Sequence, residues 1–517
     1  MRKRLSINAL LLFYGLLSAA FYCSLLPLWE GFDEFYHYGY VQHISTTWSI
    51  PVIWRTPISR ELWDSLDFAP VSHFLQPYFQ RPSTKFEDYF RLPAEQRISQ
   101  RRALDSIPPA RQREPSPRDN YEAKQSPLSY FLLAPFDRLL TTASLSTRVL
   151  TLRLLLSLGS MLLLWIGARG LARRLALSGV LESAALFVIL CCQMLYGATC
   201  HIANDALLIP WTVFFLNAVI DSFAAPTYRR TALVAILMAA GLLIKASLLV
   251  FLPLALLIRR AWLSAAILTV LAGPWYLRNL LLYHNVTGTV DTTAGVGPAE
   301  LVRAAVAIPW RTSIAAMAHT ALWTGNNSFT TFSASTLNMI LALLALAGIL
   351  YAFRLRRTTA ELVTLAGIAL GCIGLALVTV FFFYATKGAI TAAMPWYMQI
   401  LLAPVVLLCF LGLSRWNRWG RWIAMATIVL WTYFAATSWV AKLVPLYGGF
   451  EDAHARPRQL LAWYLHDAGM RDSILGTLCP APLPLLYFLF FGLLSTLPLA
   501  AVLLLRQLAR GNSHFHS

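Results

Sequence analysis

The chain has 517 residues, of which 58% are hydrophobic, and its mean hydropathy of +0.59 lies well above that of a soluble globular domain. Apolar runs of about 18–25 residues recur along it, which is the length that crosses the ~30 Å core of a bilayer. These features exclude a soluble protein. The formal net charge of +18 is therefore first a signal of membrane topology and not of nucleic-acid binding.

The cysteines indicate neither a disulfide framework nor a metal site. There are seven, and no CxxC or other metal-ligand spacing occurs among them. Most of them lie inside apolar runs, namely Cys23, Cys191, Cys192, Cys372 and Cys409.

The N-terminal part predicts one span followed by a long external region. Residues 1–4 are basic and are expected in the cytoplasm by the positive-inside rule, so 5–28 is a retained first span that crosses outward. Residues 29–147 follow as a long external loop with short interfacial helices. Within it, 86–105 is expected to form one amphipathic surface helix, and 107–118 a proline-rich loop.

The rest of the chain alternates apolar and arginine-rich segments, and it predicts an all-α polytopic membrane protein with about twelve spans. Transmembrane helices are expected in 148–277 and 334–441, a second external loop in 278–333, a third in 442–480, and the last span and cytoplasmic tail in 481–517. The even count places both termini in the cytoplasm. The expected later spans are 149–170, 181–198, 205–220, 231–244, 247–258, 262–277, 337–353, 362–384, 398–413, 423–440 and 484–505.

An acidic stretch at the outer edge of the first span is the main candidate site. Residues 29–43 read WEGFDEFYHYGYVQH, in a chain with only 24 Asp and Glu, and acids at a membrane edge are costly unless they bind or react. Asp33 and His37 share a helix face at i, i+4 if the stretch is helical. Asp33 is then a general base, or Asp33, Glu34 and His37 bind a divalent cation, or the acids cap a helix.

Four further polar positions lie at expected outer membrane edges. Glu122 and Gln125 precede a helix that starts at a proline, so they contact a polar ligand or form a plain helix N-terminus. For Asn204 and Asp205, helix capping is the favoured interpretation over direct chemistry.

The lysines run against the topology rule. Apart from Lys3, all of them fall outside or at an outer edge, and they are Lys85, Lys124, Lys245, Lys387 and Lys442. Lys245, Arg278 and Lys387 either snorkel to the headgroups or bind the phosphate of a lipid.

These residues, taken in order, resemble the GT-C superfamily of membrane glycosyltransferases, most nearly the branch related to protein O-mannosyltransferases and aminoarabinose transferases. An Arg-Tyr pair of many relatives is replaced here by Trp396-Tyr397, which makes Lys387 and Arg278 substitute cations. The residues that carry the resemblance are Asp33-Glu34-Phe35-Tyr36-His37-Tyr38, Gln125-Ser126-Pro127-Leu128-Ser129-Tyr130, Asn204-Asp205, Gly241 to Lys245, and Pro274, Trp275, Tyr276, Arg278 and Asn279.

The resemblance implies a GT-C fold and an inverting transfer of sugar from a polyprenyl-phosphate donor, on the outer face of a bacterial cytoplasmic membrane. The acceptor is a lipid, glycan or protein, with membrane lipids as further partners and no nucleic acid. Asp33 and Glu34 are then catalytic, with Asp33 as the base. The resemblance requires no cofactor, and it leaves open whether a divalent cation is bound. The implied substrate-binding residues are His37, Glu122, Gln125, Asn204, Asp205, Lys245, Arg278, Lys387 and Tyr397.

Two other classes remain open, a transporter or flippase and a non-enzymatic membrane protein on the same scaffold. A transporter is disfavoured because no inverted repeat is visible and because Glu182, Asp221 and Glu361 lie at span ends. The discriminating expectation is spatial. In an enzyme Asp33, Glu122, Lys245 and Arg278 converge on one outward-facing cavity, and in a transporter they do not.

Overall fold

The computed structural model describes residues 7–73, 75–79, 84–289, 296–323, 325, 332–449, 457–476, 478 and 480–510. The basic segment 1–4 and the end of the predicted tail lie outside these residues, as do parts of the predicted second and third external loops. The described chain is almost entirely helical and confirms the all-α polytopic membrane class.

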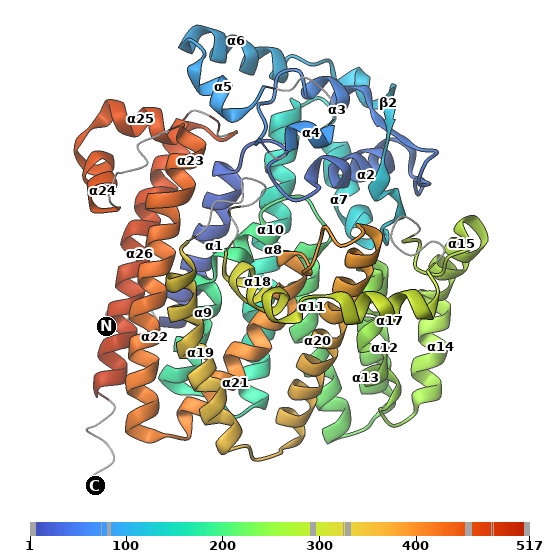
Figure 1. The fold of residues 1–517 in the computed structure, drawn as a ribbon, viewed down its shortest axis with the longest axis vertical. Coiled ribbons are helices and arrows are strands. Elements are labelled where there is room, and N and C mark those ends of the chain that lie inside the picture. The colour runs from blue at the N-terminus through green and yellow to red at the C-terminus, as the bar shows by residue number, and fades with distance from the viewer. Residues whose placement is uncertain are drawn as a thin grey trace.

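Eight helices in the described part of the chain are long and apolar enough to cross a membrane. They stand roughly side by side in Figure 1. They are α1 (Ile7–Leu25), α8 (Leu145–Arg174), α11 (Asp205–Ala224), α19 (Ala334–Phe353), α20 (Thr359–Ala385), η5 with α21 (Pro395–Leu401 and Leu402–Ser414), α22 with η6 and α23 (Asn417–Thr437, Ser438–Leu443 and Val444–Gly448) and α26 (Leu483–Arg510).

The other four predicted spans are broken or short. α9 and α10 (Gly179–Cys191 and Gln193–Thr199) meet at 58°, and α14 and α15 (Ala261–Leu271 and Gly273–Tyr283) meet at 53°. The second break falls at Gly273-Pro274, where proline removes a helical hydrogen bond. α12 (Tyr228–Ile244) has 17 residues, and η3 with α13 (Ala246–Phe251 and Leu252–Leu256) is shorter still. Counting each bent pair as one span gives up to ten, so the number twelve stays a prediction.

The region between α1 and α8 folds over one end of the helices, which we call the covered end (Figure 1). At the opposite, bare end the helices are joined by short turns. The chain leaves α1 toward the covered end and returns through α26, so both described chain ends lie at the bare end. The elements of the covering region are α2 (Glu34–Thr47), β1 (Pro57–Ser59), α3 (Arg60–Ser65), α4 (Leu75–Phe79), α5 (Phe86–Arg91), α6 (Ala94–Asp105), η1 (Pro109–Arg113), β2 (Pro115–Asp119), η2 (Tyr121–Lys124) and α7 (Leu128–Leu139).

Two local predictions for this region are wrong. The single amphipathic helix expected over 86–105 is two helices, because Pro93 forces an extended turn between α5 and α6. The expected proline-rich loop instead contains η1 and β2, and β2 pairs antiparallel with β1, with Pro57 opposite Asp119.

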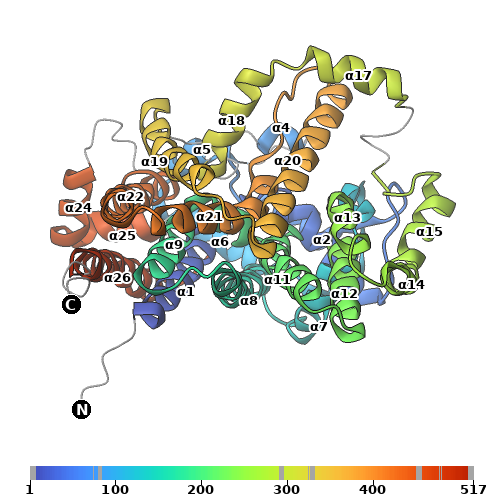
Figure 2. The ribbon, with the colours of Figure 1, turned by 90° about the horizontal axis from the view of Figure 1, so that it is seen from below.

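Viewed along the helix axes, the bundle has an elongated cross-section (Figure 2). α22 and α26 lie at one end of the section and α12 to α15 at the other, with α8 and α11 between them. α17 (Pro298–Ala307) and α18 (Trp310–Leu322) run across the bundle in the predicted second external loop (Figure 1). α24 (Pro457–His466) and α25 (Ala468–Gly476) lie at the covered end beside α26.

Candidate functional site

Asp33 stands in the turn that leads from α1 into α2, at the covered end. Its backbone is left-handed, with φ of +56°, a conformation that aspartate tolerates better than most residues. Its carbonyl accepts from the N–H groups of Tyr36 and His37 at 3.0 and 3.1 Å. The Asp33 side chain makes no capping hydrogen bond. The acids thus occupy the N-cap and the first turn, as the capping interpretation predicts, but without a side-chain capping hydrogen bond from Asp33. Because Asp33 precedes the helix, it does not share the expected helical face with His37.

The Asp33 carboxylate lies within a cluster of charged side chains from distant segments. The Tyr121 side chain hydrogen-bonds it, and Glu122, Lys124 and Lys245 lie close enough to act on it electrostatically. Burial and the Glu122 carboxylate raise the pKa of Asp33 from 3.8 to about 6, against the opposing effect of Tyr121 and the two lysines. A carboxylate with this pKa is ionised at neutral pH and is still able to take up a proton, as a general base requires.

Glu122 lies in η2, which Asn120 begins by accepting from the Glu122 N–H at 3.0 Å. Glu122 is 4% exposed, and its Oε2 has no hydrogen-bond partner among the described residues. A buried carboxylate oxygen without a partner costs free energy, so such atoms commonly mark a bound ligand, ion or water. Glu122 therefore offers an acceptor inside the cluster.

Lys245 forms a buried ion pair with Asp205. Its Nζ lies 2.7 and 2.8 Å from the two carboxylate oxygens of Asp205 and 4.4 Å from the centre of the Tyr397 ring. Lys245 follows α12 directly and Asp205 begins α11, so the pair joins two adjacent spans at the covered end. Lys245 is 6% exposed and so does not snorkel toward headgroups.

Asn204 occupies the N-cap position of α11 but does not cap the helix with its side chain. Its Nδ2 donates to Gln125 Oε1 at 3.2 Å and to the Ile244 carbonyl at 3.1 Å. The predicted N-cap position of Asn204 and the first-turn position of Asp205 are therefore confirmed, but the Asn204 side chain bonds other segments and not the helix start. Asn204 instead holds the start of α11, the end of α12 and the segment before α7 together.

His37 lies on α2, close enough to Asp205 and Lys245 to interact with them electrostatically. Its Nδ1 is 2.8 Å from the Tyr130 hydroxyl, and Tyr130 stacks on Tyr40 with ring centres 4.0 Å apart. Burial lowers the pKa of His37 to about 3, although the nearby Asp205 opposes this shift. His37 is thus neutral at physiological pH and acts as a hydrogen-bonding partner, with no charge to offer a phosphate.

Glu34 has a different environment from its neighbour Asp33. It is fully buried and forms a bidentate ion pair with Arg153 of α8, with Oε1 2.6 Å from the Arg153 Nε. The same Oε1 accepts from the Ile202 N–H at 3.0 Å. Both carboxylate oxygens are therefore engaged, and the pair fixes the turn that carries Asp33.

Arg278 and Lys387 lie outside the direct contacts of Asp33. Arg278 donates to the Pro51 carbonyl at 2.9 Å, and its guanidinium lies 5.0 Å from the centre of the Trp275 ring. It also acts electrostatically on Tyr40, which places it at the edge of the cluster. Lys387 is exposed beyond the end of α20, and within the described residues its ammonium makes no hydrogen bond or ion pair. Of the four residues expected to converge on one outward-facing cavity, Asp33, Glu122 and Lys245 lie close enough to interact electrostatically, and the cavity itself stays a prediction.

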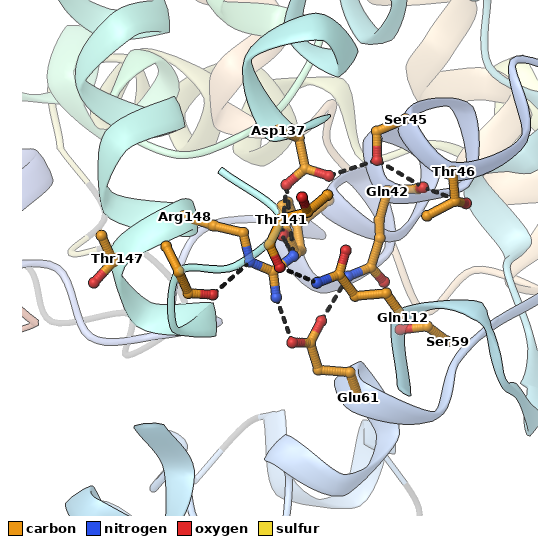
Figure 3. Close-up of polar contacts among 12 residues, drawn as sticks. Gln42, Ser45, Thr46, Ser59, Glu61, Gln112, Asp137, Thr141, Thr147 and Arg148 are labelled. Carbon is orange, nitrogen blue, oxygen red and sulfur yellow. Dashed lines mark hydrogen bonds and ion pairs between the residues drawn. The ribbon is translucent and has the colours of Figure 1, made fainter. Parts of the chain in front are cut away.

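A second buried charge network, which the sequence did not predict, anchors α2 to α8 (Figure 3). Arg148 of α8 pairs with Glu61 and lies 3.7 Å from Asp137 Oδ1. Gln42 of α2 donates to Glu61 at 2.7 Å, and Ser45 donates to Asp137 at 2.6 Å. The sequence does contain a feature that could have predicted buried ion pairs here. Arg148 and Arg153 place positive charge at the outer edge of a span, against the positive-inside rule.

The described residues contain no group of three or more His, Cys, Asp or Glu side chains placed to hold a metal ion. Asp33, Glu34 and His37 therefore do not form such a group, since Glu34 pairs with Arg153 and His37 with Tyr130. Tyr121, Lys124 and Tyr130 were not predicted as site residues, although they flank Glu122 and Gln125 in the chain.

An apolar pocket opens next to Tyr397 between α11, η3, α20 and η5. Gly371 and Gly374 of α20 line the pocket and allow neighbouring side chains to pack closely against the helix. A Cβ at Gly371 would approach Leu401 to 2.5 Å, and one at Gly374 would approach Val250 to 3.2 Å. Val378 continues the wall. The pocket thus brings an apolar surface to the polar cluster.

Comparison of the chain with models of protein families, with curated proteins and with solved structures finds no match.

Proposed function

We propose that the protein is an inverting glycosyltransferase that moves a sugar from a polyprenyl-phosphate donor to an acceptor at the covered end, on the outer face of the membrane. The observation that carries the proposal is the convergence of Asp33, Glu122 and Lys245, from three separate segments, around a carboxylate whose pKa is about 6. The GT-C resemblance of the sequence gives these residues their roles.

In the proposed reaction the acceptor's hydroxyl or amine attacks the anomeric carbon of the donor sugar. The acceptor proton passes to the Asp33 carboxylate as the new bond forms. The bond between the anomeric carbon and the phosphate oxygen breaks, and polyprenyl phosphate leaves with the electron pair. Attack from the face opposite the leaving group inverts the anomer.

The cations of the cluster stabilise the departing phosphate. Lys124 and Lys245 both act on Asp33 electrostatically, and Arg278 lies at the edge of the cluster with a planar fork suited to phosphate oxygens. Glu122 Oε2 and the Asn204 Oδ1 lack hydrogen-bond partners in the described chain and can bind sugar hydroxyls. The apolar side chains beside Tyr397 would pack against the first prenyl units.

The test measures transfer from a labelled polyprenyl-phosphate sugar into the lipid and protein fractions of membranes. Asp33→Asn removes the charge and keeps the shape, and asparagine also tolerates the left-handed backbone. We expect transfer to fall about 10²–10⁴-fold, the usual contribution of a general base. The matched control is Asp88→Asn, since the Asp88 side chain is 61% exposed in the same region.

Full transfer by Asp33→Asn at equal expression would remove this carboxylate from the chemistry. If the wild-type protein transfers sugar from none of the donors tested, the result would favour a transporter or a non-enzymatic membrane protein over a glycosyltransferase.

A further inference from the structure

The bare end of the bundle contains a cavity of about 930 Å³, on the far side of the molecule from Asp33. Six spans end or begin around it, namely α8, α11, α19, α20, α21 and α22. The proposed function makes no use of this cavity, so a role for the cavity is independent of that function.

The two acids that line the cavity are already paired. Arg174 binds both carboxylate oxygens of Asp221, with its Nε 2.8 Å from Oδ1. Arg415 binds Glu361, with its Nη2 2.6 Å from Oε1. Glu361 also accepts from the Tyr351 hydroxyl at 3.1 Å. The charge and the hydrogen-bonding capacity of both carboxylates are therefore largely used within the wall.

Two further arginines line the cavity without a carboxylate partner in the described chain. Arg354 donates to the Arg415 carbonyl at 3.1 Å, and its guanidinium lies 4.5 Å from the centre of the Trp416 ring, which holds it in place. The Arg356 side chain is exposed and makes no ion pair with any described residue. Four arginines and two acids line the cavity, so its formal charge is +2.

The lining of the cavity also contains apolar side chains, one of which faces outward. Phe353 is 77% exposed at the end of α19, and Leu355 and Ile220 belong to the wall. A positively charged hollow at the ends of membrane-spanning helices is suited to a lipid phosphate, because the arginines can bind the phosphate while the acyl chains run along the apolar helices. We infer that this cavity binds the phosphate-bearing headgroup of an anionic phospholipid.

The experiment measures lipid binding to the purified full-length protein by native mass spectrometry, with phosphatidylglycerol, phosphatidylethanolamine and inorganic phosphate as probes. The Arg354→Gln/Arg356→Gln double variant should lose affinity for phosphatidylglycerol about thirtyfold, since each basic residue near an anionic lipid contributes about 1 kcal/mol and a tenfold change corresponds to about 1.4 kcal/mol. Arg356→Gln alone should lose less, and it disturbs no contact of the fold.

The matched control is Arg229→Gln/Arg506→Gln, which removes the same charge from the bare end but from α12 and α26, outside the cavity. Unchanged phosphatidylglycerol binding in this control supports the site. Equal losses in both double variants would reduce the effect to general surface charge and overturn the inference. Displacement of the lipid by millimolar inorganic phosphate, or equal affinity for phosphatidylethanolamine, would overturn the assignment to an anionic lipid.

Discussion

The properties of Asp33 depend on residues that are distant in sequence, and Glu122 is the one whose effect is simplest to test. Its carboxylate raises the pKa of Asp33, second only to burial. A base must be ionised to act, so the proposed transfer should rise with pH through about pH 6, the pKa of Asp33. Glu122→Gln keeps the shape and removes one of the causes that raise this pKa.

We therefore expect the Glu122→Gln variant to reach half of its maximal transfer rate at a lower pH than the wild type. The measurement is the pH profile of transfer, whose midpoint is independent of the amount of active protein. An unchanged midpoint would show that the two carboxylates do not interact in the working enzyme.

At the scale of single residues, the sequence indicated candidate site residues because charged residues are scarce in an apolar chain. Asp33, Glu122 and Lys245 were each predicted separately as site residues, because each lies at an expected outer membrane edge. The structure places them close to one another. The difference between Asp33 and Glu34 was not predictable. It depends on Arg153, which lies 119 residues from Glu34 and reaches it only after α8 has packed beside the turn.

The packing of α2 against α8 depends on the buried charge network of Arg148, Glu61 and Asp137. Arg148, Glu61 and Asp137 are essentially inaccessible to solvent, and no other described cation bonds either carboxylate. Arg148→Met should cost about 3–5 kcal/mol, because it leaves buried carboxylates without their partner. We expect a lower midpoint of thermal unfolding in detergent. Arg91→Gln is the control, since Arg91 is 75% exposed and its loss should stay within about 0.5 kcal/mol.

The apolar pocket beside Tyr397 gives a second prediction for the arrangement of elements. Val378 lines it from α20, and Val378→Trp should place a large ring over this apolar surface. If prenyl units pack against the surface, the KM for a long-chain polyprenyl donor should rise severalfold, while a donor with a very short chain should be used as before. Equal effects on both donors would indicate a general distortion of α20 and not a blocked lipid path.

The whole molecule presents two unlike ends, and their placement across the membrane is the prediction that belongs to this scale. Among the described cysteines only Cys372 is exposed, on the long apolar helix α20. Cysteines introduced as Glu95→Cys at the covered end and Thr359→Cys at the bare end should react with an impermeant maleimide from opposite sides. We expect Glu95→Cys to label from outside and Thr359→Cys from the cytoplasm, and the reverse pattern would exclude an external active site.

The all-α membrane class was predicted from hydropathy and is confirmed, whereas the sidedness inferred from arginine placement stays a prediction. The details of the spans were not predicted. All twelve expected spans correspond to helical segments, because a bilayer-length apolar run has few alternatives to a helix. The bends in α9–α10 and α14–α15 and the shortness of α12 and η3–α13 depend on packing between helices. Hydropathy averages over a window and does not register them.

The π-helical turn of η6 sets the rotational phase of the helix beyond it. It lies between α22 and α23, and past it the Tyr447 hydroxyl reaches Glu30 Oε1 at 3.3 Å, three residues before Asp33. A π-helical turn holds about one residue more than an α-helical one, and each residue turns a helix by about 100°. Deleting a single residue from 438–443 would leave a continuous helix of regular pitch and yet swing Tyr447 away from Glu30. The one extra residue in this membrane span thus sets the direction in which Tyr447 points. It thereby allows the C-terminal third of the chain to contact the acidic turn.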